Sequence, residues 1–290
     1  MLVIDFIKTI AKKTPLVHPL YSNVASYIKY RKDKKILRRN KRYKDMYEGK
    51  RCFILGNAPS LKKHNLRLLE DEYVFTVNSM SASKEFDIVK PNFHVVVDSA
   101  RFDEDNELFH KQMKDLAERD YKPICIFSAR FRDHIEKYGL NKSLEIIYVY
   151  PKSSIRRIKD INLTEKVPPY QNVVNVALYT ALYLGFSEIY LIGCDMTGFI
   201  TIYDENDNVS YGGHFYEEDN PEEVEYMKKA KKERTNEFML NAYGFVFRLL
   251  RFTEEYAIKN GKRIFNAGIG GALDVFPRVK FEDLFDEQDK

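Results

Sequence analysis

Residues 171–196 read QNVVNVALYTALYLGFSEIYLIGCDM, and this stretch decides the fold class. Its first half, residues 174–186, has the apolar character of a buried helix. Its second half, residues 188–195, is an apolar run of strand length that ends at Asp195. Runs this apolar suit strands that are covered on both faces. The stretch therefore predicts a helix followed at once by a central strand, which is the repeating unit of a parallel sheet.

The same alternation recurs along the chain. Strand-length apolar runs separated by helical or mixed segments occur at CFILG (52–56), YVFTVN (73–78), FHVVVD (93–98), PICIF (123–127), EIIYVY (145–150) and KRIFNAG (262–268). A long helical pattern ends near Lys259. We therefore expect a doubly wound, mostly parallel, Rossmann-like α/β sheet.

Ligands of such sheets bind beyond the carboxyl ends of the strands, so the residues that follow each apolar run are the candidates for a site. Strand ends need turn-forming residues in any case, but five ends rich in Asn, Asp, Ser or Gly exceed that need. The pattern predicts a nucleotide-type site. Its candidate residues are Gly56, Asn57, Ala58, Pro59, Ser60, Asn78, Asp98, Asp195, Gly268 and Gly270.

The turn GNAPSL at residues 56–61 is the most informative of these ends. Gly56 and Asn57 can both adopt positive φ, and Ser60 is placed to cap a following helix. Free backbone N–H groups at such a helix start attract phosphate. The turn matches neither the Rossmann glycine pattern nor a Walker loop, because Lys62 lies outside the required spacing.

Positive charge is concentrated at the start of the chain. From Met1 to Arg51 there are 15 Lys and Arg against 4 Asp and Glu, so this part carries +11 and the rest −7 of the net +4. We interpret residues 1–50 as a basic amphipathic arm and residues 51–290 as the catalytic domain. The arm suits an anionic membrane surface, through residues 1–48, better than nucleic acid, although a solvated helix on the body stays an alternative.

Composition limits the remaining possibilities. A chain of 290 residues with 44% hydrophobic and 31% charged residues is neither a mini-protein nor disordered. It contains neither the ~20-residue apolar run of a membrane span nor a secretory signal, so we expect a cytoplasmic location. Cys52, Cys125 and Cys194 form no CxxC pair and fit buried thiols.

Four stretches carry a family resemblance. ILGNAPSL (54–61), the Val77-Asn78 pair and residues 171–196 are similar to bacterial sialyltransferases that act on lipooligosaccharide. Together with the ending IFNAGIGGALDVFPRVKFEDLF (264–285), they resemble more closely the glycosyltransferase-like proteins of capsule and lipopolysaccharide synthesis, which share a domain with archaeal 6-hydroxymethylpterin diphosphokinases. The resemblance covers roughly residues 51–285 and none of the basic arm.

The resemblance implies a GT-A-like variant of the fold and an inverting glycosyltransferase that uses a CMP-activated acidic sugar without metal or other cofactor. It implies that Gly56, Asn57 and Ser60 hold the donor, and that Asn78 and Asp98 line the same pocket. Asn172 would meet the cytidine or its phosphate. The departures at Ala58, at Asn172-Val173 and at Asp98 leave sialic acid and Kdo-type donors open.

His214 stands where the resemblance places the general base, and an imidazole pKa near neutrality suits that role. Tyr203 and Tyr211 are candidates for phenolic hydroxyls directed at the leaving phosphate. All three fall in residues 197–235, a long polar segment that we interpret as a lid. The acceptor would be a glycan or lipid-linked glycan at the inner face of the cell membrane.

Three alternatives stay open. Asp103-Glu104-Asp105 fits a metal-binding D-x-D, although we expect first-turn acids of a helix there. An ATP and magnesium-dependent diphosphokinase-like transferase would use Asp98, Asp103 and Asp195 as ligands. A nucleotide-binding module without turnover would make His214 dispensable. The residues also leave a homo-oligomer open.

Overall fold

The computed structural model describes residues 30–102, 106–199, 202–203, 209–210, 215, 225 and 234–285. Its centre is a parallel sheet whose strands are β1 (Arg51–Leu55), β2 (Tyr73–Val77), β3 (Phe93–Val96), β4 (Ile124–Ser128), β5 (Ile146–Pro151), β6 (Lys166–Val167), β7 (Glu188–Ile192) and β10 (Arg263–Asn266). The eight strands follow the order β10-β7-β1-β2-β3-β4-β5-β6, and each neighbouring pair is parallel. The predicted α/β class is confirmed.

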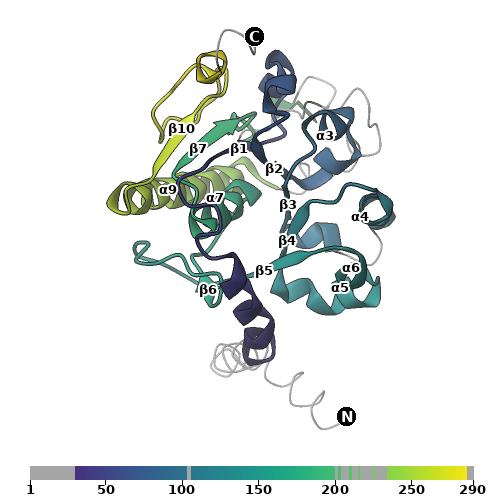
Figure 1. Cartoon of the computed structure of the whole chain (residues 1–290). Coiled ribbons are helices and arrows are strands. Elements are labelled where there is room, and N and C mark those ends of the chain that lie inside the picture. The colour runs from purple at the N-terminus through teal and green to yellow at the C-terminus, as the bar shows by residue number, and fades with distance from the viewer. Residues whose placement is uncertain are drawn as a thin grey trace.

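Helices cover both faces of this sheet (Figure 1). On one face lie α3 (Lys84–Val89), α4 (Glu107–Glu118), α5 (Arg132–Lys137) and α6 (Leu140–Ser143). On the other lie α7 (Val173–Leu184) and α9 (Asn236–Lys259), which contact each other. Both long helices end within two residues of the expected positions. The sheet is therefore doubly wound, as predicted.

The side chains of each strand alternate between the two layers, as a period of two requires. In β1, Cys52 and Ile54 join the core beneath α7, whereas Phe53 and Leu55 join a core on the opposite face. The same alternation separates Ile147 from Tyr148 in β5. Burial on both faces explains why these strands are continuous apolar runs rather than alternating ones. All three cysteines are buried and free.

Short 3-10 helices fill most of the turns between the long elements. They are η1 (Arg39–Tyr43), η2 (Pro59–Lys63), η3 (Leu66–Leu69), η4 (Asn78–Ala82), η5 (Ser99–Phe102), η6 (Ala129–Phe131) and η8 (Phe281–Leu284). A two-stranded antiparallel sheet of β8 (Ile202–Tyr203) and β9 (Val209–Ser210) lies within the segment expected to form a lid. These strands were not predicted, because each has only two residues.

The described part of the basic segment is built into the folded body. Residues 30–38 are α-helical and continue into η1. Leu37 is fully buried, and the Asn40 amide donates to the carbonyl oxygens of Tyr148 and Leu163 at 2.7 and 2.8 Å. Tyr47 then stacks on Phe186 at 4.9 Å between ring centroids. Residues 30–48 therefore complete the hydrophobic core, and the folded body begins well before residue 51.

The start of α4 differs from expectation. Asn106 is its N-cap and accepts a hydrogen bond from the Phe109 amide at 3.0 Å, so the first-turn acid is Glu107. Asp103, Glu104 and Asp105 precede this cap, outside the first turn, and lie outside the described residues. Among the residues that are described, no helix is both long and apolar enough to cross a membrane.

Candidate functional site

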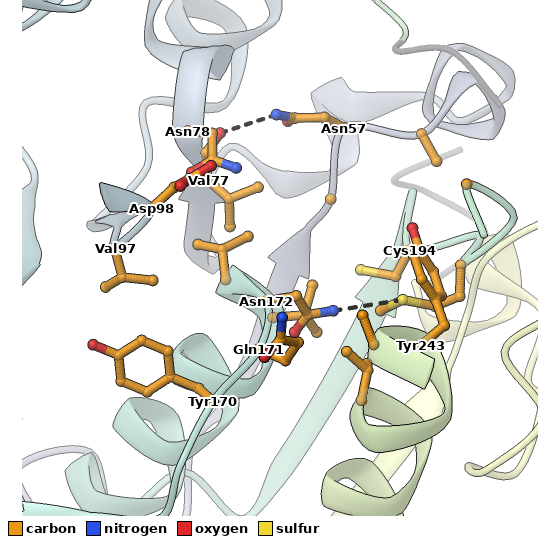
Figure 2. A pocket seen from close by; sticks show the side chains of 18 of the residues that line it. Asn57, Val77, Asn78, Val97, Asp98, Tyr170, Gln171, Asn172, Cys194 and Tyr243 are labelled. Carbon is orange, nitrogen blue, oxygen red and sulfur yellow. Dashed lines mark hydrogen bonds between the residues drawn. The ribbon is translucent and has the colours of Figure 1, made fainter. Parts of the chain in front are cut away.

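A cleft of about 580 Å³ opens where the strand order reverses. In the sheet, β1 lies between β2 and β7. The chain continues from β1 to β2 on one side and from β7 to β10 on the other, so the loops after β1 and β7 leave toward opposite faces. A crevice at such a switch point is the usual ligand site of open parallel sheets. Figure 2 shows Asn57, Asn78 and Asp98 along one side of this cleft and Tyr170, Gln171 and Asn172 along the opposite side.

The turn after β1 fits closely against the end of β7. The Gly56 amide donates to the Ile192 carbonyl and the Ala58 amide to the Gly193 carbonyl, both at 2.9 Å. A Cβ at Gly56 would collide with the Gly193 carbonyl oxygen, so only glycine fits there. These two amides are occupied by the protein itself. The phosphate contacts expected from this turn therefore need other donors.

The Ser60 side chain was expected to cap a helix, but it does not. Pro59 opens η2, Ala58 is its N-cap, and the buried Ser60 hydroxyl donates to the carboxylate of Asp195. The Asp195 carbonyl in turn accepts from the Ala272 amide at 2.6 Å. Asp195 therefore joins the turn after β1, the end of β7 and the glycine loop after β10, and it also lines the cleft.

Two asparagines give the β1 and β2 side of the cleft its polarity. The Asn57 amide nitrogen donates to the Val77 carbonyl at 3.2 Å, which ties the two strand ends together. Asn78 has a left-handed backbone with φ of 49°, a conformation that Asn adopts more readily than most residues. Its buried side-chain oxygen has no hydrogen-bond partner among the described residues. An unpartnered buried oxygen is an acceptor for a donor group of a ligand.

The amino terminus of α7 forms the opposite side. Asn172 is the N-cap, and its side-chain oxygen accepts from the Asn175 amide at 3.0 Å. Asn172 Nδ2 lies 3.7 Å from the sulfur of Met196. Val173 and Val174 also line the cleft. The first-turn amides of a helix have no carbonyl partner within that helix, so this end carries partial positive charge and favours anions.

Two arginines and a partly buried tyrosine were not predicted. Arg130, Arg234 and Tyr170 line the cleft together with Ser128. Burial raises the pKa of Tyr170, and a hydrogen bond with Ser128 and the charge of Arg130 oppose that shift. Ser128 and Arg130 follow the apolar run at residues 123–127. The rule that ligands bind beyond the carboxyl ends of strands, which we call the strand-end rule, could therefore have found them. Arg234 lies on the approach to α9, and no sequence motif marks it.

The amino-terminal part of α9 forms an apolar wall that sequence patterns also missed. Phe238, Met239, Ala242, Tyr243 and Val246 face the cleft from this helix. Phe238 is half exposed at 51%. Burial raises the pKa of Tyr243, which keeps its hydroxyl neutral over the physiological range. The cleft thus combines polar and charged side chains, among them Asp98, Asp195, Arg130 and Arg234, with the apolar wall of α9, as ligand sites for nucleotides and other small molecules do.

The glycine loop after β10 has a structural role. Gly268 and Gly270 are not among the described residues that line the cleft. The Gly268 amide donates to the Asn266 side chain at 2.9 Å, and Gly270 has φ of 76°. Arg278 donates to loop carbonyl oxygens, including that of Gly270 at 2.9 Å. This arginine therefore holds the loop.

The predicted catalytic residues fall largely outside the described part of the chain. His214 and Tyr211 lie outside it, and Tyr203 belongs to β8, where only its backbone is described. Phe215, which follows His214 in the sequence, is buried, and its amide donates to the Asn57 carbonyl at 3.0 Å. At this residue the segment that we interpreted as a lid contacts the turn after β1.

Two other histidines, His64 and His94, are buried and lie outside the cleft lining. His94 is fully buried in β3, its Nδ1 lies 2.9 Å from the Thr76 hydroxyl, and burial lowers its pKa to about 3. Burial also lowers the pKa of His64. Within the described ranges no group of three or more His, Cys, Asp and Glu side chains is arranged to hold a metal ion.

Comparison with known proteins places the chain in a family. Residues 18–198, more than half of the 290, match the model described as 6-hydroxymethylpterin diphosphokinase MptE-like. The chain belongs to the MptE-like family. The matched region of this MptE-like chain runs from before the described helix at residue 30 into the loop after β7. The resemblance expected from the motifs is confirmed at this level.

Two solved structures are similar to the MptE-like chain at low identity. One is the MAf glycosyltransferase from Magnetospirillum magneticum AMB-1, with 16% identity and a TM-score of 0.46 over 95% of this chain. This chain spans 43% of that protein's length. The other is the sialyltransferase CstII from Campylobacter jejuni, solved with the substrate analogue cytidine-5'-monophosphate, with 16% identity and a TM-score of 0.43. That match covers 80% of this chain and 85% of the other. No curated protein matches the sequence.

Proposed function

We propose that this MptE-like chain is an inverting, metal-independent glycosyltransferase that uses a CMP-activated acidic sugar of the sialic acid or Kdo type. Its product would be a surface polysaccharide or lipooligosaccharide. The observation that carries the proposal is the cleft at the switch point, where the start of α7 and two arginines meet an apolar wall. A nucleoside monophosphate ester needs this combination of an anion site and an apolar surface for its base.

The asparagines supply the contacts that distinguish one donor from another. Asn78 offers a buried amide oxygen, which can accept from an exocyclic amine or a ribose hydroxyl. Asn57 holds the end of β2 in position, and Asn172 caps α7 while its amide nitrogen faces the Met196 side of the cleft. The motif resemblance, rather than the geometry, selects cytidine as the base.

His214 would act as the general base. The acceptor hydroxyl oxygen attacks the anomeric carbon, the bond from that carbon to the phosphate oxygen breaks, CMP departs, and His214 takes the hydroxyl proton. The Phe215 amide bonded to the Asn57 carbonyl supports this role. Phe215 is the residue that follows His214 in the sequence. Tyr203 and Tyr211 remain candidates for stabilising the leaving phosphate.

A ligand panel tests the donor class. Thermal shifts would be measured with CMP, CDP, UDP, GDP and ATP, each with magnesium and with EDTA. A ligand that binds only the folded state raises the melting temperature according to its concentration and affinity. We expect CMP and CDP to stabilise the protein in EDTA, and ATP to have no effect there. A panel in which UDP or GDP alone stabilises the protein would reject the cytidine donor.

Two variants separate chemistry from binding. For His214→Ala, kcat should fall about 100-fold or more while the CMP thermal shift is kept, because a general base acts mainly in the transition state. For Asn57→Ala, the thermal shift itself should shrink. Asn141→Ala, exposed on α6 and outside the cleft lining, is the matched control for the second variant. Wild-type turnover by His214→Ala on the true acceptor would remove this residue from the mechanism.

The family match also favours a second candidate, an ATP-dependent diphosphokinase-like transferase. In that reaction an alcohol oxygen attacks the β-phosphorus of ATP, the bond to the α-phosphate breaks, and AMP departs. Asp98 and Asp195 both line the cleft and would be its magnesium ligands, with Asp103 outside the described residues. Stabilisation by ATP with magnesium and none by cytidine nucleotides would select this candidate. A nucleotide shift with no turnover in any assay would leave a binding module.

We place the reaction at the inner face of the cell membrane, where a lipid-linked acceptor would be found. Support for this location comes from the basic segment at the start of the chain.

A further inference from the structure

The helix at residues 30–43 presents two opposite faces. One face holds Asp33, Leu37, Asn40 and Tyr43, which are all buried against the body. The other face carries six exposed cations at helical spacing, and we call it the cationic face: Arg31, Lys32, Lys35, Arg38, Arg39 and Arg42. The buried face fixes the orientation of the helix, so these charges form a rigid surface rather than a mobile tail.

Two acids of the body, Glu136 and Glu145, line a hollow together with Arg39 and Arg42, so the six cations of this face outnumber these two acids. The only acid between residues 30 and 44 is Asp33, and it is buried in an ion pair with Arg132 at 2.8 Å. Arg42 contacts Glu145 at 2.8 Å, but both side chains of this pair are at least half exposed. An ion pair so exposed is screened by solvent and removes little of the positive potential.

The helix also starts beside the cleft. The Tyr30 ring lies 5.2 Å from the Tyr150 ring, and the Arg130 guanidinium lies 5.4 Å over the same Tyr150 ring. Arg130 in turn lines the cleft. The helix then runs along β5 toward the opposite rim of the sheet, where the Tyr43 hydroxyl meets Glu145. A flat surface bound along the helix would therefore reach the side of the cleft at residue 30.

We propose that the cationic face is a docking surface for anionic lipid headgroups, and that it holds the side of the cleft at Arg130 against the membrane. Charge complementarity supports a lipid surface, since each Lys or Arg near an anionic leaflet adds favourable energy. The shape does too, because the face is one side of a single helix. In the described part of the chain only Arg39 and Arg42 of its six cations border a hollow, which two glutamates also line. Single-stranded nucleic acid is bound in grooves with stacking aromatic rings. Tyr30 and Tyr43, the only aromatic residues of this helix, both face the body.

The proposal is independent of turnover, so it is tested by binding alone. The full chain would be sedimented with vesicles of phosphatidylcholine containing about 30% phosphatidylserine, and with pure phosphatidylcholine. We expect binding to the anionic vesicles only, with release as salt rises above about 0.3 M. Binding to a DNA duplex with no binding to vesicles would overturn the proposal in favour of nucleic acid.

A matched pair of variants identifies the surface. Lys32→Gln, Lys35→Gln and Arg38→Gln combined remove three charges from the cationic face. Lys63→Gln, Lys111→Gln and Lys122→Gln combined remove three exposed charges elsewhere. We expect the first variant to lose about 100-fold in vesicle partitioning and the second to lose less than about 5-fold.

Both variants should keep the wild-type melting temperature and the wild-type thermal shift with nucleotide, because all six side chains are exposed and lie outside the cleft lining. Equal losses in the two variants would mean that net charge alone matters, which overturns the assignment of this face. Undiminished binding by the first variant would place the membrane contact elsewhere in the chain. A failed glycosyltransferase assay would leave these outcomes unchanged, so the two proposals fail separately.

Discussion

Single residues in the cleft serve both the fold and the site. Asn57 lines the cleft while its amide joins the ends of β1 and β2, and Asn172 lines it while capping α7. Asp195 lines it while it binds Ser60. Substitution at these positions therefore changes stability and ligand binding together, and a binding assay needs a stability measurement beside it.

Gly56→Ala tests the close approach of β1 and β7. The added Cβ would meet the Gly193 carbonyl and lie 2.8 Å from the Cys194 sulfur, so the two strand ends must separate. We expect a loss of about 1–3 kcal/mol in the free energy of unfolding. Urea denaturation measures it.

Gly244→Ala is the control for this substitution. Gly244 lies inside α9, and a Cβ there would meet nothing within 4 Å. Replacing glycine by alanine in a helix interior should stabilise the protein by about 0.5–1 kcal/mol. A Gly56→Ala protein as stable as Gly244→Ala would show that the contact between the strand ends is loose.

His94 makes stability depend on pH. Its pKa is about 3 in the folded protein, because burial disfavours the imidazolium. In the unfolded chain a histidine pKa is about 6.5. Below that value the unfolded chain gains a proton that the folded chain does not. The free energy of unfolding therefore decreases as the pH is lowered, by about 1.4 kcal/mol per pH unit.

His94→Asn isolates this effect, since it keeps an atom near the Nδ1 position facing Thr76 but cannot titrate. Between pH of about 6.5 and about 5 the wild type should lose about 2 kcal/mol more than the variant. Urea midpoints at both pH values measure the difference. Parallel pH dependence in the two proteins would mean that His94 accepts a proton in the folded state.

At the scale of elements, periodicity predicted the long helices and the seven longer strands. It succeeded because strands buried on both faces, and a helix buried all round such as α7, leave continuous apolar runs in the sequence. It failed for β6, β8 and β9, which have two residues each. The concentration of charge led us to interpret residues 1–50 as an arm. Within residues 30–48, the many charges concealed one buried residue per turn at Asp33, Leu37 and Asn40.

Leu37→Ala tests whether this helix belongs to the core. Leu37 is fully buried, so its truncation should cost about 2–5 kcal/mol and lower the melting temperature. Lys35→Ala, exposed on the opposite side, should change stability by less than about 0.5 kcal/mol. Removal of residues 1–48 should then yield a destabilised protein. A truncated protein with the wild-type melting temperature would restore the interpretation of this segment as an arm.

At the scale of the molecule, the site is a property of strand order. The strand-end rule found the residues after β1, β2, β3 and β7, because it depends only on where apolar runs stop. It could not predict which ends are neighbours. The order places β7 beside β1, so residues 56–58 and 193–198 share the cleft. The apolar wall of α9 was equally beyond sequence patterns, since its residues resemble those of any core helix.

A ligand in the cleft should therefore protect several distant segments at once. With saturating CMP, amide hydrogen exchange should slow at residues 56–58, at 172–174, at 193–198 and at the start of α9, because all of them line one cavity. The amides of α4 and α5 that lie behind the opposite face should exchange at unchanged rates. Asn57→Ala at the same CMP concentration should reduce protection in every one of these segments together, since one ligand is lost from one site. Protection confined to a single segment would mean that the nucleotide binds at one strand end only, and the switch-point site would have to be abandoned.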